Sequence, residues 1–121
     1  MKFKKGLVSI ILNCHNGEKY LKEALSSVKA QTHKNWELIF WDNRSKDRSA
    51  KIVKSFKIKK LKYYLSKHHT SLYAARNLAM KKATGEFVSF IDADDIWEKN
   101  KLKEQIKLFK DKETAVVYGN S

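Results

Sequence analysis

Three carboxylates stand close together where a strongly apolar segment of this chain ends. The run Gly85–Ile91 leads directly into Asp92, Asp94 and Asp95. Apolar runs of this kind are typical of central strands in a parallel sheet, whereas like charges this close repel one another unless a cation or a proton compensates them. Hard oxygen ligands suit Mg²⁺ or Mn²⁺, which often bridge to a phosphate. A divalent metal site is one interpretation, and an acidic turn that caps the next helix is the other.

The segments that must position these acids alternate between strand-like and helix-like patterns. Apolar runs bounded by turn residues predict strands at Leu7–Leu12, Glu37–Trp41, Leu61–Leu65, Phe87–Ile91 and Ala115–Tyr118. Apolar residues recur with helical spacing between them, at Leu21, Ala24, Leu25 and Val28, at Ile52, Val53 and Phe56, at Leu72, Ala75, Leu78 and Ala79, and at Leu102, Ile106 and Phe109. Ser45 or Asp47 is expected to cap the second helix, and Ser71 the third.

This alternation predicts a single α/β domain over residues 1–121, Rossmann-like, with a mainly parallel sheet covered by helices on both faces. Parallel sheets place ligand sites at the carboxyl ends of their strands. The residues at these ends are polar, namely Asn13, Cys14, His15 and Asn16 after the first strand, Asp42 and Asn43 after the second, and the three acids after the fourth. We therefore expect them to converge on one edge of the sheet.

The chain is strongly basic, with 26 Lys and Arg against 13 Asp and Glu and a net charge of +13. From Arg44 to Lys67 there are ten basic residues and one acid, Asp47. Such a stretch suits a solvated surface, an anionic membrane surface or nucleic acid. All the basic residues except Arg44, Arg48 and Arg76 are Lys. Readers of bases and phosphates favour Arg, so this composition disfavours nucleic acid as a partner.

The composition favours a folded cytoplasmic protein. Apolar residues make up 42% of the chain, which supports a core, and no stretch approaches the roughly 18–20 apolar residues that cross a bilayer. The single cysteine, Cys14, excludes an internal disulfide and fits a reducing cytosol. We expect peripheral contact with the inner face of the membrane to be one role for the Lys-rich surface.

The four glycines form no phosphate-binding motif. Gly6, Gly17, Gly85 and Gly119 give neither the G-x-G-x-x-G fingerprint nor the G-x-x-x-x-G-K loop. If this edge binds a diphosphate, the acids acting through a metal would have to neutralise it. Such a metal would serve as a Lewis acid and stabilise the charge on a leaving diphosphate.

Motifs along nearly the whole chain resemble those of the family-2 glycosyltransferases. The matching segments are Val8–Leu21, Ala30–Thr32, Trp36–Ile39, Asp42–Asp47, Ala75–Asn77, Ala83–Phe87 and Asp92–Trp97. The resemblance implies the GT-A fold, a three-layer α/β/α sandwich, with a nucleotide-diphosphate sugar as donor and a saccharide or lipid-linked acceptor. It also implies an Asp-x-Asp metal site for Mn²⁺ or Mg²⁺, and inverting transfer in bacterial cell-surface polysaccharide or lipopolysaccharide synthesis.

The resemblance also implies roles for individual residues. Those implied to line the nucleotide are Asn13, Cys14, His15, Asn16, Glu18, Asp42, Asn43, Arg76 and Asp94. Asn43 stands where the family usually has the Asp that contacts the base, and Arg76 is expected near the diphosphate or the acids. Asp94 and Asp95 are implied to hold the metal.

Two motifs depart from the family pattern. The family usually shows Pro-Thr-Tyr where this chain has Asn13-Cys14-His15, and Asp-Asp-Gly-Ser where it has Asp42-Asn43-Arg44-Ser45. Base identity is therefore less constrained, and a uridine nucleotide is the default.

The resemblance also bears on the end of the chain. The family's catalytic base and acceptor-binding segment lie further along than the last residue, Ser121. We therefore expect the catalytic base beyond Ser121, and we expect this chain to be the nucleotide-binding half of a GT-A domain, not competent for sugar transfer by itself.

Some residues keep more than one interpretation. Trp36 and Trp41 are expected in the core, whereas Trp97 suits either the core or stacking on a ligand. His15 suits either a nucleotide contact or a plain loop position. Two alternatives for the whole chain are a basic module that binds nucleic acid or an anionic membrane, and a nucleotide-binding remnant without activity.

Overall fold

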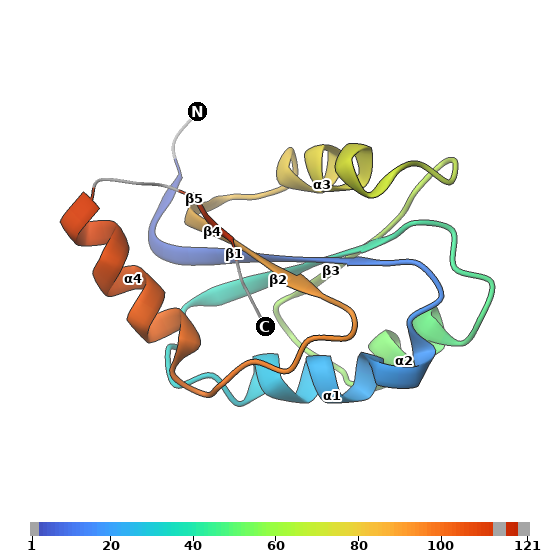
Figure 1. Ribbon diagram of the computed structural model, residues 1–121, viewed down its shortest axis with the longest axis horizontal. Helices are drawn as coiled ribbons and strands as arrows, with labels where there is room; N and C mark the ends of the chain where they lie inside the picture. The colour runs from blue at the N-terminus through green and yellow to red at the C-terminus, as the bar shows by residue number, and fades with distance from the viewer. Residues whose placement is uncertain (1–2, 113–115, 119–121) are drawn as a thin grey trace.

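The computed structural model describes residues 3–112 and 116–118, with side chains described through residue 108. Within these residues the chain forms one sheet with strands β1 (Lys4–Cys14), β2 (Trp36–Asp42), β3 (Leu61–Leu65), β4 (Gly85–Asp92) and β5 (Val116–Tyr118). The helices are α1 (Glu18–Lys29), α2 (Ser49–Ser55), α3 (Leu72–Met80) and α4 (Lys101–Lys112) (Figure 1).

The strand order is β3-β2-β1-β4-β5, and every neighbouring pair is parallel. The sequence therefore predicted the parallel sheet correctly. β1 lies at its centre, where Asn13 is in register with Trp41 of β2 and Asp92 of β4. The carboxyl ends of β1, β2 and β4 consequently meet at one edge, as parallel pairing requires.

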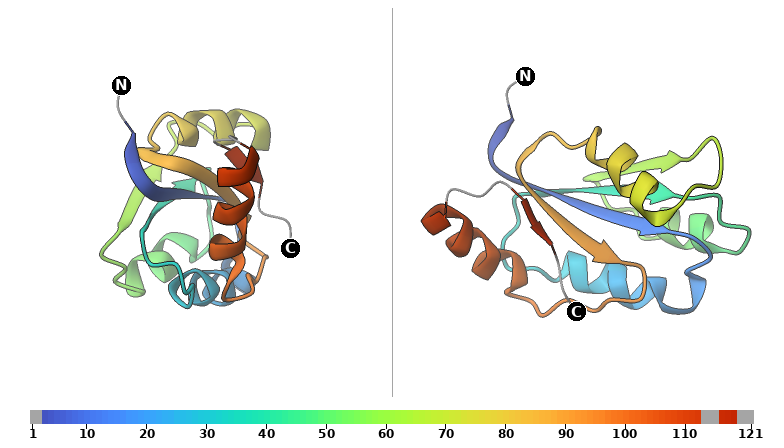
Figure 2. Two further views of the ribbon diagram at one scale, coloured as in Figure 1. Left: turned by 90° about the vertical axis from the view of Figure 1, so that its left-hand side faces the viewer. Right: turned by 45° about the horizontal axis from the view of Figure 1, so that its top comes forward.

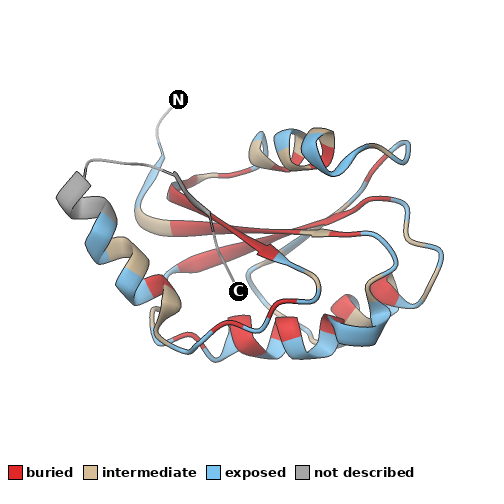
Figure 3. Cartoon of the chain, viewed as in Figure 1, coloured by how far each residue is buried: buried red, intermediate tan, exposed pale blue. Residues whose placement is uncertain are grey.

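Helices cover both faces of the sheet and make three layers. Side chains of β1 alternate, so that Ile10 and Leu12 belong to the core beneath α1, α2 and α4, while Ile11 belongs to the core beneath α3. Two views in Figure 2 show α3 on one side of the sheet and the other three helices on the opposite side. β2 and most of β1 and β4 are buried, whereas β3 at the edge is only partly buried and the outer helix surfaces are exposed (Figure 3). The predicted three-layer α/β/α arrangement is confirmed.

Helix caps were predicted with mixed success. Ser71 caps α3 as expected, since its hydroxyl accepts a hydrogen bond from the N–H of Ala74 at 3.1 Å. The prediction that Ser45 or Asp47 caps α2 is wrong, because Arg48 occupies the N-cap position. Asp47 instead joins two helix starts, where its carboxylate accepts from the N–H of Ser49 at 2.9 Å and of Glu18 at 3.0 Å.

Three expectations concern residues at the end of the chain. The last strand was predicted to begin at Ala115, which lies outside the described residues, as does the side chain of Phe109. The catalytic base is expected beyond Ser121, which also lies outside them. The position of the catalytic base therefore stays a prediction. Among the described helices, none combines the length and apolar composition needed to cross a membrane.

Candidate nucleotide and metal site

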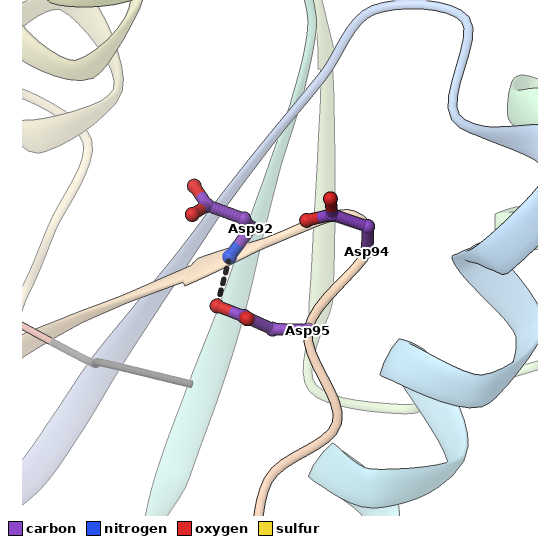
Figure 4. Close-up of side chains that lie close together, drawn as sticks. All are labelled: Asp92, Asp94 and Asp95. Atoms are coloured by element: carbon purple, nitrogen blue, oxygen red, sulfur yellow. Dashed lines mark hydrogen bonds between the residues drawn. The ribbon is translucent and has the colours of Figure 1, made fainter.

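The three acids lie in a tight turn at the end of β4. The N–H of Asp95 donates to the carbonyl of Asp92 at 3.0 Å, and the N–H of Asp92 donates back to Oδ2 of Asp95 at 3.3 Å. One carboxylate oxygen from each of Asp92, Asp94 and Asp95 lies within 4.8 Å of the others (Figure 4). Asp92 and Asp94 are exposed, whereas Asp95 is 5% exposed. The turn therefore gathers three hard oxygen ligands, which is the donor set that Mg²⁺ and Mn²⁺ prefer.

The alternative interpretation of these acids, a helix cap, is wrong. The next helix, α4, begins at Lys101, and an irregular segment separates it from Asp95. No helix N-terminus within the described residues after Asp95 uses this carboxylate cluster to satisfy its N–H groups. Hydrogen bonds to a helix N-terminus therefore do not offset the electrostatic repulsion among the three carboxylates.

Arg76 of α3 forms an ion pair with this cluster. Its Nη2 lies 3.3 Å from Oδ1 of Asp92, and its guanidinium packs 5.6 Å from the centre of the Phe90 ring. Arg76 pairs with one of the three carboxylates and Lys101 interacts electrostatically with Asp95, so two basic groups act on a cluster whose oxygens a divalent cation can also ligate. The expectation that Arg76 lies near the acids is met.

Two hollows at this edge share residues from the end of β1. The first is lined by Asn13, His15, Asn16, Lys19, Asp92 and Asp94, together with neighbouring residues of α1. The second is lined by Asn13, Cys14, His15, Asn43, His69 and Thr70, together with the start of α3. Because Asn13 and His15 border both, the hollows lie side by side, one beside the acids and one beside the polar loop after β3.

His15 lines both hollows and lies at the border between them. Its Nδ1 lies 2.8 Å from the carbonyl of Asn43, and the Asn16 amide lies 3.3 Å from its Nε2. A neutral imidazole satisfies both contacts when Nδ1–H donates and Nε2 accepts. The His69 ring packs against it with a centroid distance of 4.3 Å. His15 therefore borders both hollows, and its contact with a nucleotide stays a prediction.

Three of the implied nucleotide contacts are largely buried, although Cys14 and Asn43 still line the second hollow. Asn43 is 5% exposed, and its amide donates to the Thr70 carbonyl at 2.8 Å and accepts from the Thr70 N–H at 2.9 Å. Asp42 is 1% exposed and accepts from the N–H of Ser45 and the hydroxyl of Tyr63. Burial raises the pKa of Cys14. Asn43 and Asp42 thus fix the loops after β3 and β2 through hydrogen bonds to Thr70 and Ser45. The contact of Asn43 with a base stays a prediction.

The hydrogen bond to Asp42 also affects Tyr63. Burial and this bond together raise the pKa of the Tyr63 phenol, so the hydroxyl stays protonated and continues to donate. Asp42 thus keeps the end of β2 in place, and its implied contact with the nucleotide stays a prediction. The side chain of Glu18, by contrast, is exposed and lines neither hollow.

Sequence reasoning missed the residues that β3 contributes. His69 and Thr70 line the second hollow, and the Asn43 amide holds Thr70 there. The rule that ligand sites lie at the carboxyl ends of parallel strands applies to β3 as well, so its trailing segment could have been found by the same argument. Trp97, left open between core and site, is 4% exposed and belongs to the core, as do Trp36 and Trp41.

Comparisons with known proteins identify the family of this chain. Residues 9–121 match the family described as glycosyl transferase family 2. The UDP-Glc:alpha-D-GlcNAc-diphosphoundecaprenol beta-1,3-glucosyltransferase WfgD of Escherichia coli is 39% identical over 114 residues, which is 94% of this chain and 45% of that protein. The chain therefore spans about half the length of this curated relative.

Solved structures match as well. TarS of S. aureus, in complex with UDP-GlcNAc, superposes with a TM-score of 0.80 at 32% identity, covering 92% of this chain and 32% of that one. The mannosyltransferase PcManGT of Pyrobaculum calidifontis, in complex with GDP-Man and Mn²⁺, has a TM-score of 0.80 at 24% identity, over 84% of this chain and 32% of that one. The fold is that of the GT-A glycosyltransferases. This chain belongs to glycosyl transferase family 2.

Proposed function

We propose that residues 1–121 form the nucleotide-sugar-binding part of a glycosyltransferase that moves a sugar from a UDP-sugar to an acceptor hydroxyl with the help of Mn²⁺ or Mg²⁺. The observation that carries the proposal is the turn Asp92–Asp95 at the carboxyl edge, where three carboxylates gather beside two hollows. The relative from Escherichia coli uses UDP-Glc and a lipid-linked acceptor, which supports a role in bacterial cell-surface polysaccharide synthesis.

The donor set at this turn fits a divalent cation. Asp94 and Asp95 would hold the metal together with Asp92, and the bound metal would supply Lewis-acid stabilisation of the leaving diphosphate. Arg76, already paired with Asp92, presents N–H donors to the same region and would orient phosphate oxygens. Both contributions act on charge that develops as the sugar leaves, so they favour the transition state.

The shape of the edge suits a nucleoside diphosphate. The hollow beside Asp92 and Asp94 would receive the phosphates, and the hollow beside His69 and Thr70 would receive the base. The His15 and His69 rings offer aromatic surface there, and Asn13 brings a side-chain amide to the border of both hollows. A uridine base is the proposed occupant.

The acceptor site and the general base are proposed to depend on residues beyond Ser121. A base must lie within hydrogen-bond reach of the attacking hydroxyl. In this scheme Asp92, Asp94 and Asp95 are committed to the metal and Arg76, and the chain covers only 45% of its relative from Escherichia coli.

UDP with Mn²⁺ is expected to raise the melting temperature of the chain, whereas uridine with Mn²⁺ is expected to leave it unchanged. At about 100 times the dissociation constant, a ligand adds about 2.7 kcal/mol to the free energy of unfolding. Differential scanning fluorimetry with UDP, UMP, GDP and uridine measures this. Equal stabilisation by uridine and UDP would contradict the proposed phosphate site, and equal stabilisation by GDP and UDP would contradict the proposed base.

A further inference from the structure

A second charged surface lies at the opposite, amino edge of the sheet. A hollow there is lined by residues that begin β1, β2 and β3, including Lys4, Lys5, Lys59 and Lys60. These four side chains are exposed, and together they are called the amino-edge lysine surface below. They come from two segments distant in sequence that the parallel sheet brings together.

The fold around this surface directs lysines outward. In the segment from Lys54 to Lys62, the side chains of Phe56, Ile58 and Leu61 are partly buried against the core, while the intervening lysines are exposed. The run is therefore anchored by its apolar residues and keeps its lysines at the surface, with the ammonium groups of Lys54 and Lys60 over the rings of Tyr63 and Trp36.

The residues that line this hollow carry far more positive than negative charge. Glu37 is the acid among them, and its Oε1 already lies 2.8 Å from Nζ of Lys62. Because this carboxylate is already paired, it does little to neutralise the amino-edge lysine surface. Burial and the neighbouring Lys34 lower the pKa of Lys60, a sign that positive charge is crowded here.

We propose that the amino-edge lysine surface docks the protein on an anionic lipid bilayer. Phe3, next to Lys4, is 58% exposed and offers an aromatic side chain for the interface beside the lysines. The point charges of Lys attract anionic headgroups without demanding a fixed geometry. This surface lies at the edge opposite the acids of β4, so it is separate from the nucleotide site.

Nucleic acid is the less suitable partner for the same residues. Binders of single strands stack bases on exposed aromatic side chains, and readers of duplexes rely on Arg. Trp36, the aromatic residue lining the hollow, is 4% exposed, and Lys60 covers its ring at 4.1 Å from the centre. The residues lining this hollow include no Arg.

The test is sedimentation of the chain with vesicles of mixed phosphatidylglycerol and phosphatidylcholine, compared with vesicles of phosphatidylcholine alone. Each Lys near an anionic bilayer strengthens binding about fivefold. The surface variant combines Lys4→Gln, Lys5→Gln, Lys59→Gln and Lys60→Gln. It should bind the mixed vesicles more than about 100-fold more weakly than the unchanged chain, which itself should bind less as salt rises.

A charge-matched control separates this site from net charge. The control variant combines Lys22→Gln, Lys99→Gln, Lys103→Gln and Lys107→Gln, which are exposed positions elsewhere. Both variants lose four of the 13 net positive charges, and only the surface variant should lose vesicle binding. If the surface variant does not fold by circular dichroism, the pair Lys4→Gln and Lys5→Gln should still weaken binding about 25-fold.

Three results would overturn the proposal. One is equal loss of vesicle binding in the surface and control variants. Another is undiminished binding by a folded surface variant. The third is tighter binding of the unchanged chain to RNA or duplex DNA than to the mixed vesicles, abolished by the surface substitutions, since that would assign the surface to nucleic acid.

Discussion

Replacing Asp94 with Asn is expected to lower the Mn²⁺-dependent affinity for UDP about 100-fold while the fold survives. The substitution removes one charged ligand from a cluster whose carboxylate oxygens lie within 4.8 Å of one another. Loss of a charged interaction worth about 3 kcal/mol weakens binding by roughly 100-fold. Because Asp94 is exposed, replacing its carboxylate with an amide should change the free energy of unfolding by less than about 0.5 kcal/mol. Isothermal titration calorimetry with UDP and Mn²⁺ measures the affinity.

Asp95→Asn provides a second measurement at the same turn. Its carboxylate accepts from the N–H of Asp92, and an Asn side-chain oxygen can accept the same bond, so we expect the turn to persist. Glu104→Gln is the matched control, because it removes an exposed acid from α4 without touching the site. Wild-type affinity in both Asp variants would mean that the acids do not hold the metal.

Glu37→Ala is expected to have the largest effect on stability, about 3 kcal/mol. Oε2 of Glu37 accepts from the hydroxyl of Ser9 at 2.6 Å and from the N–H and hydroxyl of Thr84 at 2.8 and 2.9 Å. Removing the carboxylate leaves these donors without their acceptor and breaks the pair with Lys62. Urea unfolding measures the loss. Lys62→Gln is the control and should cost less than about 1 kcal/mol, since Lys62 is exposed.

The pH dependence gives a second readout for Glu37. Burial alone would raise its pKa, but hydrogen bonds from Lys62, Ser9 and Thr84 outweigh burial and lower the pKa below 4.5. The stability that the carboxylate contributes is therefore present above pH 4.5 and lost as the pH falls through the lowered pKa. The difference between the unchanged chain and Glu37→Gln should narrow below pH 4.5, and a constant difference would contradict this account.

The sequence predicted the positions of the strands well because its apolar runs are flanked by clear turn residues. Leu61–Leu65 was predicted with the bounds that the structure has. β1 extends past Leu7–Leu12 to Lys4 and Cys14, because pairing with β4 at Lys4 and with β2 at Cys14 continues the ladder beyond the apolar run. Convergence of the strand ends followed from parallel topology alone.

The sequence could not predict how buried some site residues are. Asn43 is buried because Thr70, 27 positions further along, folds back onto its amide, and this is a tertiary contact without a local signal. The position of Trp97 in the core likewise depends on how the segment after Asp95 returns to α1. Residue type and spacing identified the edge of the sheet, and only the packed structure shows that Asn43, which lines the second hollow, also spends its amide on Thr70.

The most direct test of the metal-bridged nucleotide site is a calorimetric titration of the unchanged chain with UDP, in Mn²⁺ and then after chelation with EDTA. The proposed site predicts saturable binding in Mn²⁺ that disappears with EDTA and returns when excess Mn²⁺ is added. The reason is that the chain has no glycine loop to neutralise the diphosphate, whereas Asp92, Asp94 and Asp95 stand where a cation would do so. Equal UDP affinity with and without Mn²⁺ would contradict it.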